Sequence, residues 1–169
     1  MSGAATATVH EALLTFLRSR DINFRQLHHE PTRTSEESAR ARGESVTIGG
    51  KAILMKVGEE FTLFVVSAAR RIDSGKVRDF FGERRLRFAT RDELMALTGL
   101  VPGSVPPFGR PILPFDLYVD ESVLANDRIA FNSGSLTDSV IMQTADYLSV
   151  AEGKVFAFSA PPETHAEDR

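Results

Sequence analysis

The sequence predicts a single α/β domain with a mixed, mostly antiparallel sheet flanked by helices. Three observations lead to this fold class. Helical and strand periodicities interleave along the chain, several apolar runs are joined by short glycine turns, and 169 residues suit one hydrophobic core. The domain is expected to cover residues 8–160, between short polar ends at 1–7 and 161–169 that are predicted to be disordered.

The helices are predicted from apolar periodicity and capping residues. Thr34 and Thr90 each precede a glutamate by three residues, a capping-box pattern that satisfies two backbone N–H groups reciprocally. Gly43 is expected to end the second helix, because glycine adopts the left-handed conformation easily. Ser74 and Thr144 are expected to cap two further helices. The predicted helices cover about residues 8–20, 35–42, 74–81, 90–97 and 144–148, with a single helical turn at 120–124.

The strands are predicted from apolar runs bounded by turn residues. Gly58-Glu59-Glu60 is expected to form a hairpin turn. The run from Phe61 to Ala68 is apolar almost throughout, which is typical of a central strand buried on both faces. The predicted strands cover residues 22–27, 51–57, 61–68, 86–89, 115–119, 129–132, 139–142 and, at a sheet edge, 155–158.

Composition excludes several classes of protein. The chain has no cysteine, which excludes disulfides, thiolate zinc sites and a cysteine nucleophile. It has no apolar run of about 18 residues and no secretory signal, so we expect a cytoplasmic protein without a membrane partner. His10 and His165 lie far from His28 and His29, so no metal site is expected. No P-loop, Gly-x-Gly-x-x-Gly or Gly-x-Ser-x-Gly pattern occurs, so no nucleotide cofactor and no serine nucleophile are expected.

The segment 98–109 is the most unusual stretch of the chain. It places three glycines and three prolines in twelve residues, between a helix and a strand. Glycine permits positive φ and close approach of a ligand, whereas proline fixes φ and removes a donor. The segment is therefore either a rigid loop that presents its main chain to a ligand or a stiff turn that redirects the chain.

Basic residues gather in the middle of a chain whose net charge is −3. Arg70, Arg71, Lys76 and Arg78 are followed closely by four more arginines between residues 84 and 91. Such a stripe can bind phosphates locally on an acidic protein. The alternative is a solvated surface on which these cations pair with neighbouring carboxylates.

Three further positions are candidates for binding. Lys51 follows Gly49-Gly50 at the start of a strand, where it would hold a phosphate or carboxylate or extend into solvent. His29 precedes a proline and a capped helix, and would act as a base or hydrogen-bond its own turn. The small-residue turn 132–135 would line a pocket or form a simple hairpin.

Taken in order, these motifs resemble the YbaK/ProRS-type family of aminoacyl-tRNA editing domains. The resemblance covers about residues 8–158, and the ordered set of motifs is more specific than any one of them. The matching segments are 29–34 with Glu36, Glu37 and Ala39, 51–54, 69–73 with Lys76, Thr98-Gly99, Gly103-x-x-x-Pro107 with Phe108-Gly109, 131–135 and 146–148.

The family includes free-standing proteins that hydrolyse mischarged aminoacyl-tRNA and the editing insert of bacterial prolyl-tRNA synthetase. This chain has room for the editing domain only, so the resemblance implies a trans-acting deacylase. The implied substrate is aminoacyl-tRNA, with tRNA-Pro carrying a wrong small amino acid as the first expectation. An aminoacyl-tRNA synthetase is a further candidate partner. The alternative function is a non-catalytic module that holds tRNA ends or a protein in the same groove.

The resemblance also implies roles for residues. Lys51 would anchor the terminal adenosine or phosphate, and the loop from Gly103 to Pro107 would hold the aminoacyl group and an oxyanion through its main chain. Gly103 should therefore reject a side chain, whereas Ser104 should be replaceable. No residue is an obvious general base, and the family is thought to rely partly on substrate groups. The catalytic set is thus Lys51, Gly103 and Pro107; substrate contacts are expected from His29, Thr34, Ser104, Asn132, Ser133 and Gly134, and tRNA contacts from Arg70, Arg71 and Lys76.

The position after Lys51 departs from the family pattern. Ala52 stands where many members have a hydroxyl residue before the leucine. Pocket size and polarity select the amino acid, but one methylene is worth only about 1–3 kcal/mol in such a pocket. The departure therefore bears on the identity of the substrate amino acid rather than on activity.

Overall fold

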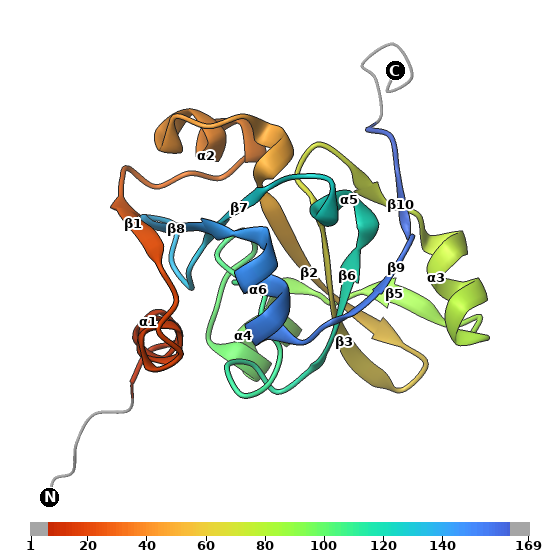
Figure 1. The fold of residues 1–169 in the computed structure, drawn as a ribbon. Helices are drawn as coiled ribbons and strands as arrows, with labels where there is room; N and C mark the ends of the chain where they lie inside the picture. The colour runs from red at the N-terminus through yellow and green to blue at the C-terminus, as the bar shows by residue number, and fades with distance from the viewer. Residues whose placement is uncertain (1–6, 163–169) are drawn as a thin grey trace, which may run out of the picture.

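The computed structural model in Figure 1 describes residues 7–162, so the disorder predicted for residues 1–6 and 163–169 lies outside the described residues. Within the described range, helices and strands interleave as the sequence predicts. The helices are α1 (Val9–Ser19), α2 (Ser35–Arg42), the 3₁₀ helix η1 (Val46–Ile48), α3 (Ser74–Phe81), α4 (Arg91–Thr98), α5 (Glu121–Leu124) and α6 (Thr144–Ala151).

The strands form one mixed sheet and two antiparallel ones. The five-stranded sheet has the order β5-β2-β3-β6-β9, a three-stranded sheet has the order β1-β8-β7, and β4 pairs with β10. The strand bounds are β1 (Phe24–His28), β2 (Gly50–Val57), β3 (Glu60–Ser67), β4 (Arg71–Ile72), β5 (Leu86–Phe88), β6 (Asp116–Asp120), β7 (Arg128–Asn132), β8 (Asp138–Gln143), β9 (Lys154–Phe156) and β10 (Ser159–Ala160).

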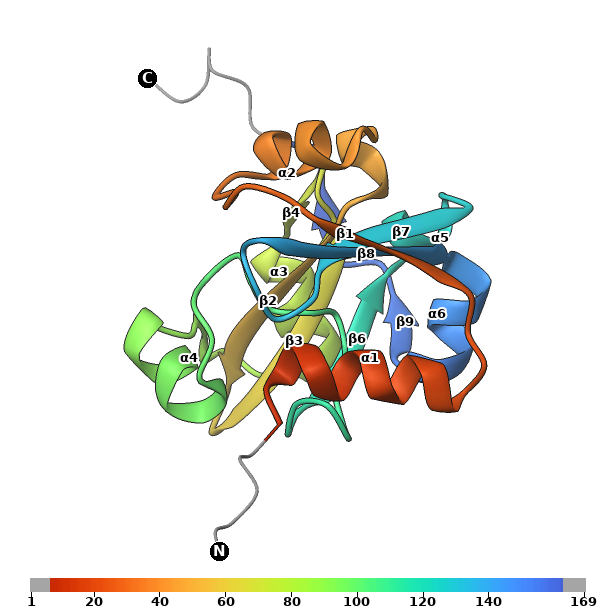
Figure 2. The ribbon, with the colours of Figure 1, turned by 90° about the vertical axis from the view of Figure 1, so that its left-hand side faces the viewer.

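The predicted mixed, mostly antiparallel pairing is confirmed. Within the large sheet, β2 is antiparallel to β3 and β5, whereas β6 is parallel to β3 and β9. The other paired strands are all antiparallel. The two larger sheets meet at a parallel bridge between Gly49 and Ala130. Figure 2 shows the three-stranded sheet between α2 above and α1 below.

The central position of β3 is confirmed by its burial. Leu63 and Val65 point into the larger hydrophobic cluster, which fills the space between the two sheets and α1. The alternate residues Phe64 and Val66 point into a second cluster beneath α3, and all four side chains are fully buried. A strand with a continuous apolar run thus serves a separate core on each face.

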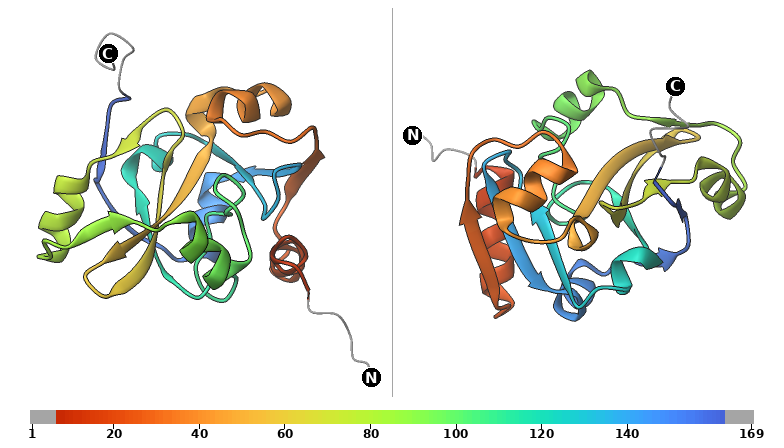
Figure 3. Two further views of the ribbon diagram at one scale, coloured as in Figure 1. Left: turned by 180° about the vertical axis from the view of Figure 1, so that it is seen from behind. Right: turned by 90° about the horizontal axis from the view of Figure 1, so that it is seen from above.

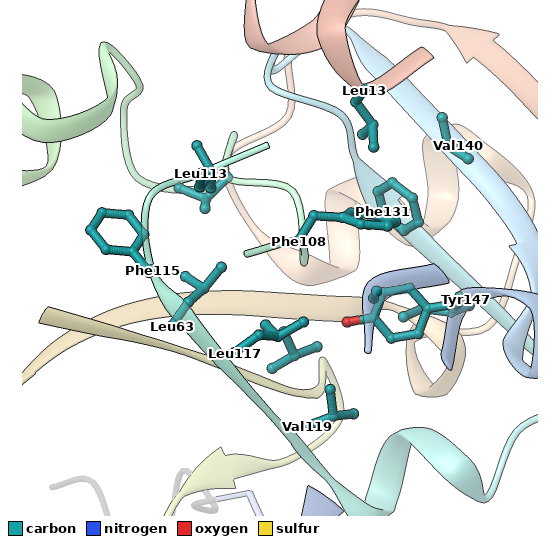
Figure 4. Close-up of a cluster of buried hydrophobic side chains, with 14 of the residues drawn as sticks. Leu13, Leu63, Phe108, Leu113, Phe115, Leu117, Val119, Phe131, Val140 and Tyr147 are labelled. Atoms are coloured by element: carbon teal, nitrogen blue, oxygen red, sulfur yellow. The ribbon is translucent and has the colours of Figure 1, made fainter. Parts of the chain in front are cut away.

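Aromatic side chains connect the loop after α4 to the larger core. Figure 4 shows Phe108 between Phe131 and Tyr147, and the ring centroids lie 5.6 and 5.3 Å apart. The hydroxyl of Tyr147 donates a 2.6 Å hydrogen bond to the carbonyl of Pro107. Burial raises the pKa of the Tyr147 hydroxyl, so it stays protonated and remains a donor. The end of the loop is therefore held inside the core.

Helix capping follows the sequence closely, with two exceptions. The capping boxes at Thr34 and Thr90 are both present, and Gly43 adopts the left-handed conformation after α2. The prediction that Ser74 caps α3 is wrong, because the Asp73 carboxylate accepts the N–H groups of Gly75 and Lys76. The prediction for Thr144 is also wrong: Thr144 is the first residue of α6, and no side chain caps that helix.

Other differences concern burial and length. Leu97, an apolar residue near the end of α4, is 41% exposed. The short strands β4 and β10 were not predicted, because two-residue strands carry no periodic pattern. Within residues 7–162, no helix is long and apolar enough to span a membrane.

The hydrogen bond from Tyr147 to Pro107 is testable against the other tyrosine of the chain. Tyr147→Phe should lower the free energy of unfolding by about 1–3 kcal/mol, because it leaves a buried carbonyl without a donor. Tyr118→Phe is the matched control, since the Tyr118 hydroxyl makes no hydrogen bond within residues 7–162. Urea denaturation measures both; equal losses in the two variants would contradict this role for Tyr147.

Candidate active site

A cavity of about 380 Å³ opens between α2, the start of β2, the start of α4 and the loop after α4. Figure 3 (left) shows α2 at the top of the molecule and α4 below it, with β2 running between them. The lining is drawn from residues 32–46, 49–54, 88–94 and 102–105, together with Ala68 and Asn132. Segments far apart in the sequence thus converge on one site.

Two glycines allow the sheets to approach each other at the floor of the cavity. A Cβ atom on Gly49 would lie 2.9 Å from the Cβ of Ala68, and one on Gly50 would lie 2.6 Å from Cδ1 of Ile129. Neither position has space for a side chain. Gly50 therefore lets Ile129 of β7 pack against the start of β2, next to the bridge between Gly49 and Ala130, whereas Gly49 makes room for Ala68 after β3. Lys51 follows at the cavity wall.

Lys51 is half-buried. Burial lowers the pKa of its ammonium group, and the charge of Glu36 opposes that effect. Its side chain lines the cavity, so the alternative of a strand-end lysine fully in solvent does not hold. Removal from water costs free energy that an anionic ligand would return.

The loop after α4 presents Gly103 to the cavity. Gly103 has a φ of +91°, a conformation that side-chain-bearing residues rarely adopt. Its carbonyl accepts a 2.7 Å hydrogen bond from Nδ2 of Asn132. Next in the chain, the Ser104 carbonyl accepts the N–H of Gly134 at 2.8 Å. The two carbonyls are thus held by the last residue of β7 and by the turn that follows it, which fixes the path of the loop at the cavity.

A network of polar side chains lies behind this loop. Nε of Arg42 donates to Oγ of Ser139 at 2.9 Å, and Nη2 donates to Oδ1 of Asn132 at 3.0 Å. Nε2 of His29 lies 2.8 Å from the same Ser139 oxygen. Burial lowers the pKa of the Arg42 guanidinium to about 10. The Asn132 amide therefore connects Arg42 on one side to Gly103 on the other.

The charges on the cavity wall are of one sign. Four cationic side chains line it, and no aspartate, glutamate or histidine is among the lining residues. The four cations are Arg33, Arg42, Lys51 and Arg91. A cavity with this wall favours an anionic ligand. Across residues 7–162, no group of three or more His, Asp or Glu side chains gathers where it could hold a metal ion.

Comparison with known proteins identifies the family. The profile of the aminoacyl-tRNA editing domain matches residues 29–150, which is well over half of the chain. The chain belongs to the aminoacyl-tRNA editing domain family. The resemblance inferred from the sequence motifs is thereby confirmed, and the matched range contains every lining residue of the cavity.

Two of the similar proteins are close to this chain in length. The multifunctional Ser/Thr-tRNA deacylase ProXp-y of Escherichia coli is 32% identical, with 92% of this chain and 95% of ProXp-y covered. The prolyl-tRNA editing protein ProX of Acetoanaerobium sticklandii is 23% identical, with coverages of 89% and 94%. The crystal structure of a candidate trans-editing enzyme for prolyl-tRNA synthetase superposes with a TM-score of 0.79 at 26% identity, with coverages of 92% and 99%.

The editing domain brings some of the predicted site residues together. Thr34, Lys51, Gly103 and Asn132 all line the cavity, although they come from a helix cap, a strand, a loop and a second strand. Sequence motifs separated by about a hundred residues thus occupy one site. Whether each contacts substrate stays a prediction.

The other predicted site residues lie outside the lining. His29 is connected to the cavity only through Ser139, whose hydroxyl also bonds the lining residue Arg42. Nδ1 of His29 lies 2.9 Å from the Glu30 carbonyl, as predicted by the alternative in which His29 hydrogen-bonds its own turn. Ser104 is buried, and its hydroxyl donates to the Val101 carbonyl at 2.8 Å. Pro107 contributes its carbonyl to the core rather than to the cavity.

Ser133 and Gly134 face the first helix instead of the cavity. Oγ of Ser133 lies 2.8 Å from Nδ1 of His10, the second residue of α1. A Cβ on Gly134 would lie 3.0 Å from the His10 backbone nitrogen. His10 lies 123 positions before Ser133 in the sequence, so the packing of the turn on α1 was not predicted.

The basic stripe divides into two parts. Arg85 and Arg87 pair with Glu83, Glu59 and Glu93 at the surface, as the solvated alternative predicted. Nε of Arg70 and Nζ of Lys76 instead converge on Ser159, at 2.6 Å from its hydroxyl and 3.2 Å from its carbonyl. Both line a second, open hollow, whereas Arg71 is exposed on β4 and does not line it.

Gly50→Ala tests the close approach that forms the cavity floor. The added Cβ would overlap Ile129, so we expect a loss of about 1–3 kcal/mol in the free energy of unfolding, typical of overpacking. Gly75→Ala in α3 is the control, because its added Cβ would meet only the Asp73 carboxylate, at 3.3 Å, and alanine is favoured over glycine in a helix. Thermal unfolding compares the two; a Gly50 variant as stable as the control would show that the sheets tolerate greater separation.

Proposed function

We propose that this protein is a trans-acting deacylase that hydrolyses the ester of tRNA mischarged with a small amino acid. The observation that supports this most directly is the cationic cavity beside the glycine loop, inside a chain that belongs to the editing family. An aminoacylated tRNA end brings negative phosphates, an apolar base and a small ester group. The cavity supplies a complement to each of these.

The phosphates would meet the cationic wall. Lys51 and Arg91 line the cavity from two different elements, at the start of β2 and of α4. Contacts between phosphates and cations supply much of the affinity of proteins for nucleic acids. Burial of the Lys51 ammonium group costs free energy, and a bound phosphate would offset that cost. We therefore assign Lys51 to the terminal phosphate.

The terminal base would stack on Phe88. This side chain lines the cavity at its rim and is 54% exposed. Exposed aromatic rings provide stacking surfaces for unpaired bases. Phe88 was missed in the sequence analysis, because an apolar residue in a predicted strand is ordinarily a core residue.

The reaction forms a bond from a water oxygen to the ester carbonyl carbon and breaks the bond from that carbon to the ribose oxygen. The ribose oxygen takes a proton, and the products are the free amino acid and uncharged tRNA. No imidazole or carboxylate lines the cavity to take the proton of the water. This favours proton transfer through a substrate group, as the family resemblance implies.

The relatives and the cavity wall both limit which amino acids are candidates for removal from the tRNA. ProXp-y is named as a Ser/Thr-tRNA deacylase, and ProX as a prolyl-tRNA editing protein. We therefore place serine and threonine beside alanine as candidate amino acids, and tRNA-Pro among the candidate tRNAs. The hydroxyl pair of Thr32 and Ser38, 2.7 Å apart at the wall, offers polar contacts to a hydroxylated side chain.

The rest of the tRNA would extend toward Arg70 and Lys76. Ala68 lines the cavity and Ala69 lines the hollow that holds these two cations, so the two sites adjoin along the chain. We propose that Arg70, Lys76 and the exposed Arg71 contact acceptor-stem phosphates. We also propose a cytoplasmic location, where tRNA is charged, and an aminoacyl-tRNA synthetase as a second partner that delivers the substrate.

A panel of mischarged tRNAs tests the proposed activity. Seryl-, threonyl- and alanyl-tRNA should each be compared on tRNA-Pro and on the matching tRNA, and at least one should be deacylated. Lys51→Ala should lower kcat/KM by about 10- to 100-fold, the effect of losing one charged hydrogen bond. Tight, salt-sensitive binding of tRNA without turnover would instead favour the non-catalytic alternative.

Phe88→Ala tests the stacking contact. We expect KM for aminoacyl-tRNA to rise about 5- to 100-fold, the range for losing one stacked base, while kcat changes little. Phe88→Tyr should retain affinity. Phe80→Ala is the matched control, since Phe80 is comparably exposed on α3 but does not line the cavity. Equal effects at both positions would argue against stacking.

Gly103→Ala and Ser104→Ala separate main-chain recognition from side-chain recognition. Gly103→Ala should lower kcat, because a side chain at φ +91° strains the loop by about 1–2 kcal/mol and shifts its main chain. Ser104→Ala should reduce thermal stability and leave kcat nearly unchanged, since its hydroxyl bonds only the loop. The reverse pattern would contradict recognition through the main chain.

A further inference from the structure

Arg42 is a partly buried cation without an acidic partner. Within residues 7–162, no carboxylate oxygen lies within 4.0 Å of its guanidinium, whereas Arg85, Arg87 and Arg128 all form ion pairs. Its protein partners are neutral oxygens of Ser139 and Asn132. Carboxylates raise the pKa of the paired arginines, but burial lowers that of Arg42. The protein thus holds a desolvated charge that it does not itself neutralise.

Such a charge is costly to the folded protein. Neutral hydrogen bonds return only part of the free energy lost when a cation leaves water. Nothing in the fold requires a cation here, because the contacts that Arg42 makes to Ser139 and Asn132 are available to a neutral donor. An anionic group of a bound ligand would neutralise the charge of Arg42.

One nitrogen of Arg42 remains available for that ligand. Nε and Nη2 are engaged, but Nη1 has no hydrogen-bond partner among the described residues. Nη1 lies against Gly49, 3.7 Å from the place where a Cβ of that residue would stand, and Arg42 lines the cavity. The absence of a side chain at Gly49 leaves this nitrogen uncovered on that side.

The position of Arg42 indicates which substrate atom it would meet. Asn132 bonds Arg42 through its oxygen and the Gly103 carbonyl through its nitrogen, so the guanidinium and the glycine loop lie one amide apart. Two hydrogen bonds hold the guanidinium in place before a ligand arrives. The free Nη1, which lies against Gly49, is therefore held on a guanidinium that is one amide away from the loop to which the aminoacyl ester is assigned.

We propose that Arg42 is a catalytic residue whose Nη1 donates to the carbonyl oxygen of the aminoacyl ester and stabilises its negative charge in the tetrahedral intermediate. This role rests on the proposed deacylase function. The carbonyl oxygen gains its charge when water adds to the carbon and loses it when the ribose oxygen leaves. Arg42 gives up no proton and is unchanged after each turnover.

A phosphate oxygen of the tRNA end is the other anionic group that Nη1 of Arg42 would bind. A phosphate is charged in the ground state as well as in the transition state, so its loss would raise KM and leave kcat unchanged. The charge on the carbonyl oxygen exists only during reaction, so its loss lowers kcat. The two sources are therefore separable by kinetics and by ligand analogues.

The decisive experiment measures binding of two non-hydrolysable analogues of seryl-adenosine. One carries a tetrahedral, anionic phosphonate in place of the ester, and the other a planar, neutral amide; each is made with and without a 5′-phosphate. The wild-type protein should bind the phosphonate more tightly than the amide by about 100-fold or more, within the range typical of transition-state analogues. Arg42→Gln should abolish that preference, and Arg42→Lys should keep part of it.

Three outcomes would overturn the assignment. They are an unchanged preference in Arg42→Gln, an equal loss of affinity for both analogues, and an effect that appears only with the 5′-phosphate. Ser139→Ala is the matched control, because it removes a partner of Arg42 but retains the charge; it should keep most of the preference. Circular dichroism and thermal unfolding establish that each variant is folded, and Arg42→Lys retains a cation if Arg42→Gln is unstable.

Turnover of mischarged tRNA, measured on the same variants, tests the proposed deacylase function separately from the role of Arg42. Arg42→Gln should lower kcat by about 100- to 1,000-fold with little change in KM, the effect of removing one oxyanion donor in other enzymes. A wild-type protein that hydrolyses no mischarged tRNA would refute the proposed function. A wild-type protein that is active, with Arg42→Gln equally active, would refute only the role of Arg42.

Discussion

The close contact of the two larger sheets at Gly49 and Gly50 is the constraint on which the site depends. Neither glycine has room for a Cβ, because Ala68 and Ile129 fill that space. The contact sets the end of β7, with Asn132, beside the start of β2, with Lys51. It also leaves the guanidinium of Arg42 against bare main chain. The cavity therefore arises where the fold brings two sheets together without side chains between them.

The Gly103-x-x-x-Pro107 segment connects this cavity to the hydrophobic core. Gly103, at one end, lies at the cavity wall with its carbonyl held by Asn132. Pro107, at the other end, gives its carbonyl to Tyr147 inside the core, and Phe108 packs among aromatic rings. Recognition by main chain requires a main chain that does not move, since a site is only as well ordered as its supports. The segment is thus a stiff turn that also lines the cavity, and the presentation of its main chain to a ligand stays a prediction.

Local features of this fold were predictable from sequence, and long-range contacts were not. The helix at 35–42 was predicted to the residue, because a capping box and a terminal glycine act within one turn. Ser74 was mistaken for a cap because the preceding Asp73 is an equally good one. Lys51 was found through its two preceding glycines.

The residues that were missed depend on the tertiary fold. Ser139 lies 97 positions from Arg42 in the sequence, and nothing at either position indicates the hydrogen bond between them. An arginine in the last turn of a helix is typically a solvated residue that favours the helix dipole. The turn at 132–135 was assigned wholly to a pocket or to a hairpin, but its residues divide: Asn132 faces the cavity and Ser133 faces α1. Sequence patterns report such neighbours only when they are close along the chain.

The distribution of charge bears on how an editing domain of this kind selects its ligand. The whole chain carries a net charge of −3, yet the wall of the cavity is cationic. At physiological salt, charges are screened beyond about 8 Å, so a nucleic acid outside the cavity gains little from cations at its wall. A tRNA end inserted among Arg33, Lys51 and Arg91 meets them at short range, where desolvation strengthens each contact. Under the proposed function, affinity would then be concentrated on the terminal nucleotide, and an end that has lost its amino acid would no longer engage the glycine loop. The charge pattern therefore favours a phosphate-bearing end inside the cavity over nucleic acid that stays outside it, and contacts other than charge must separate the acylated end from the uncharged product.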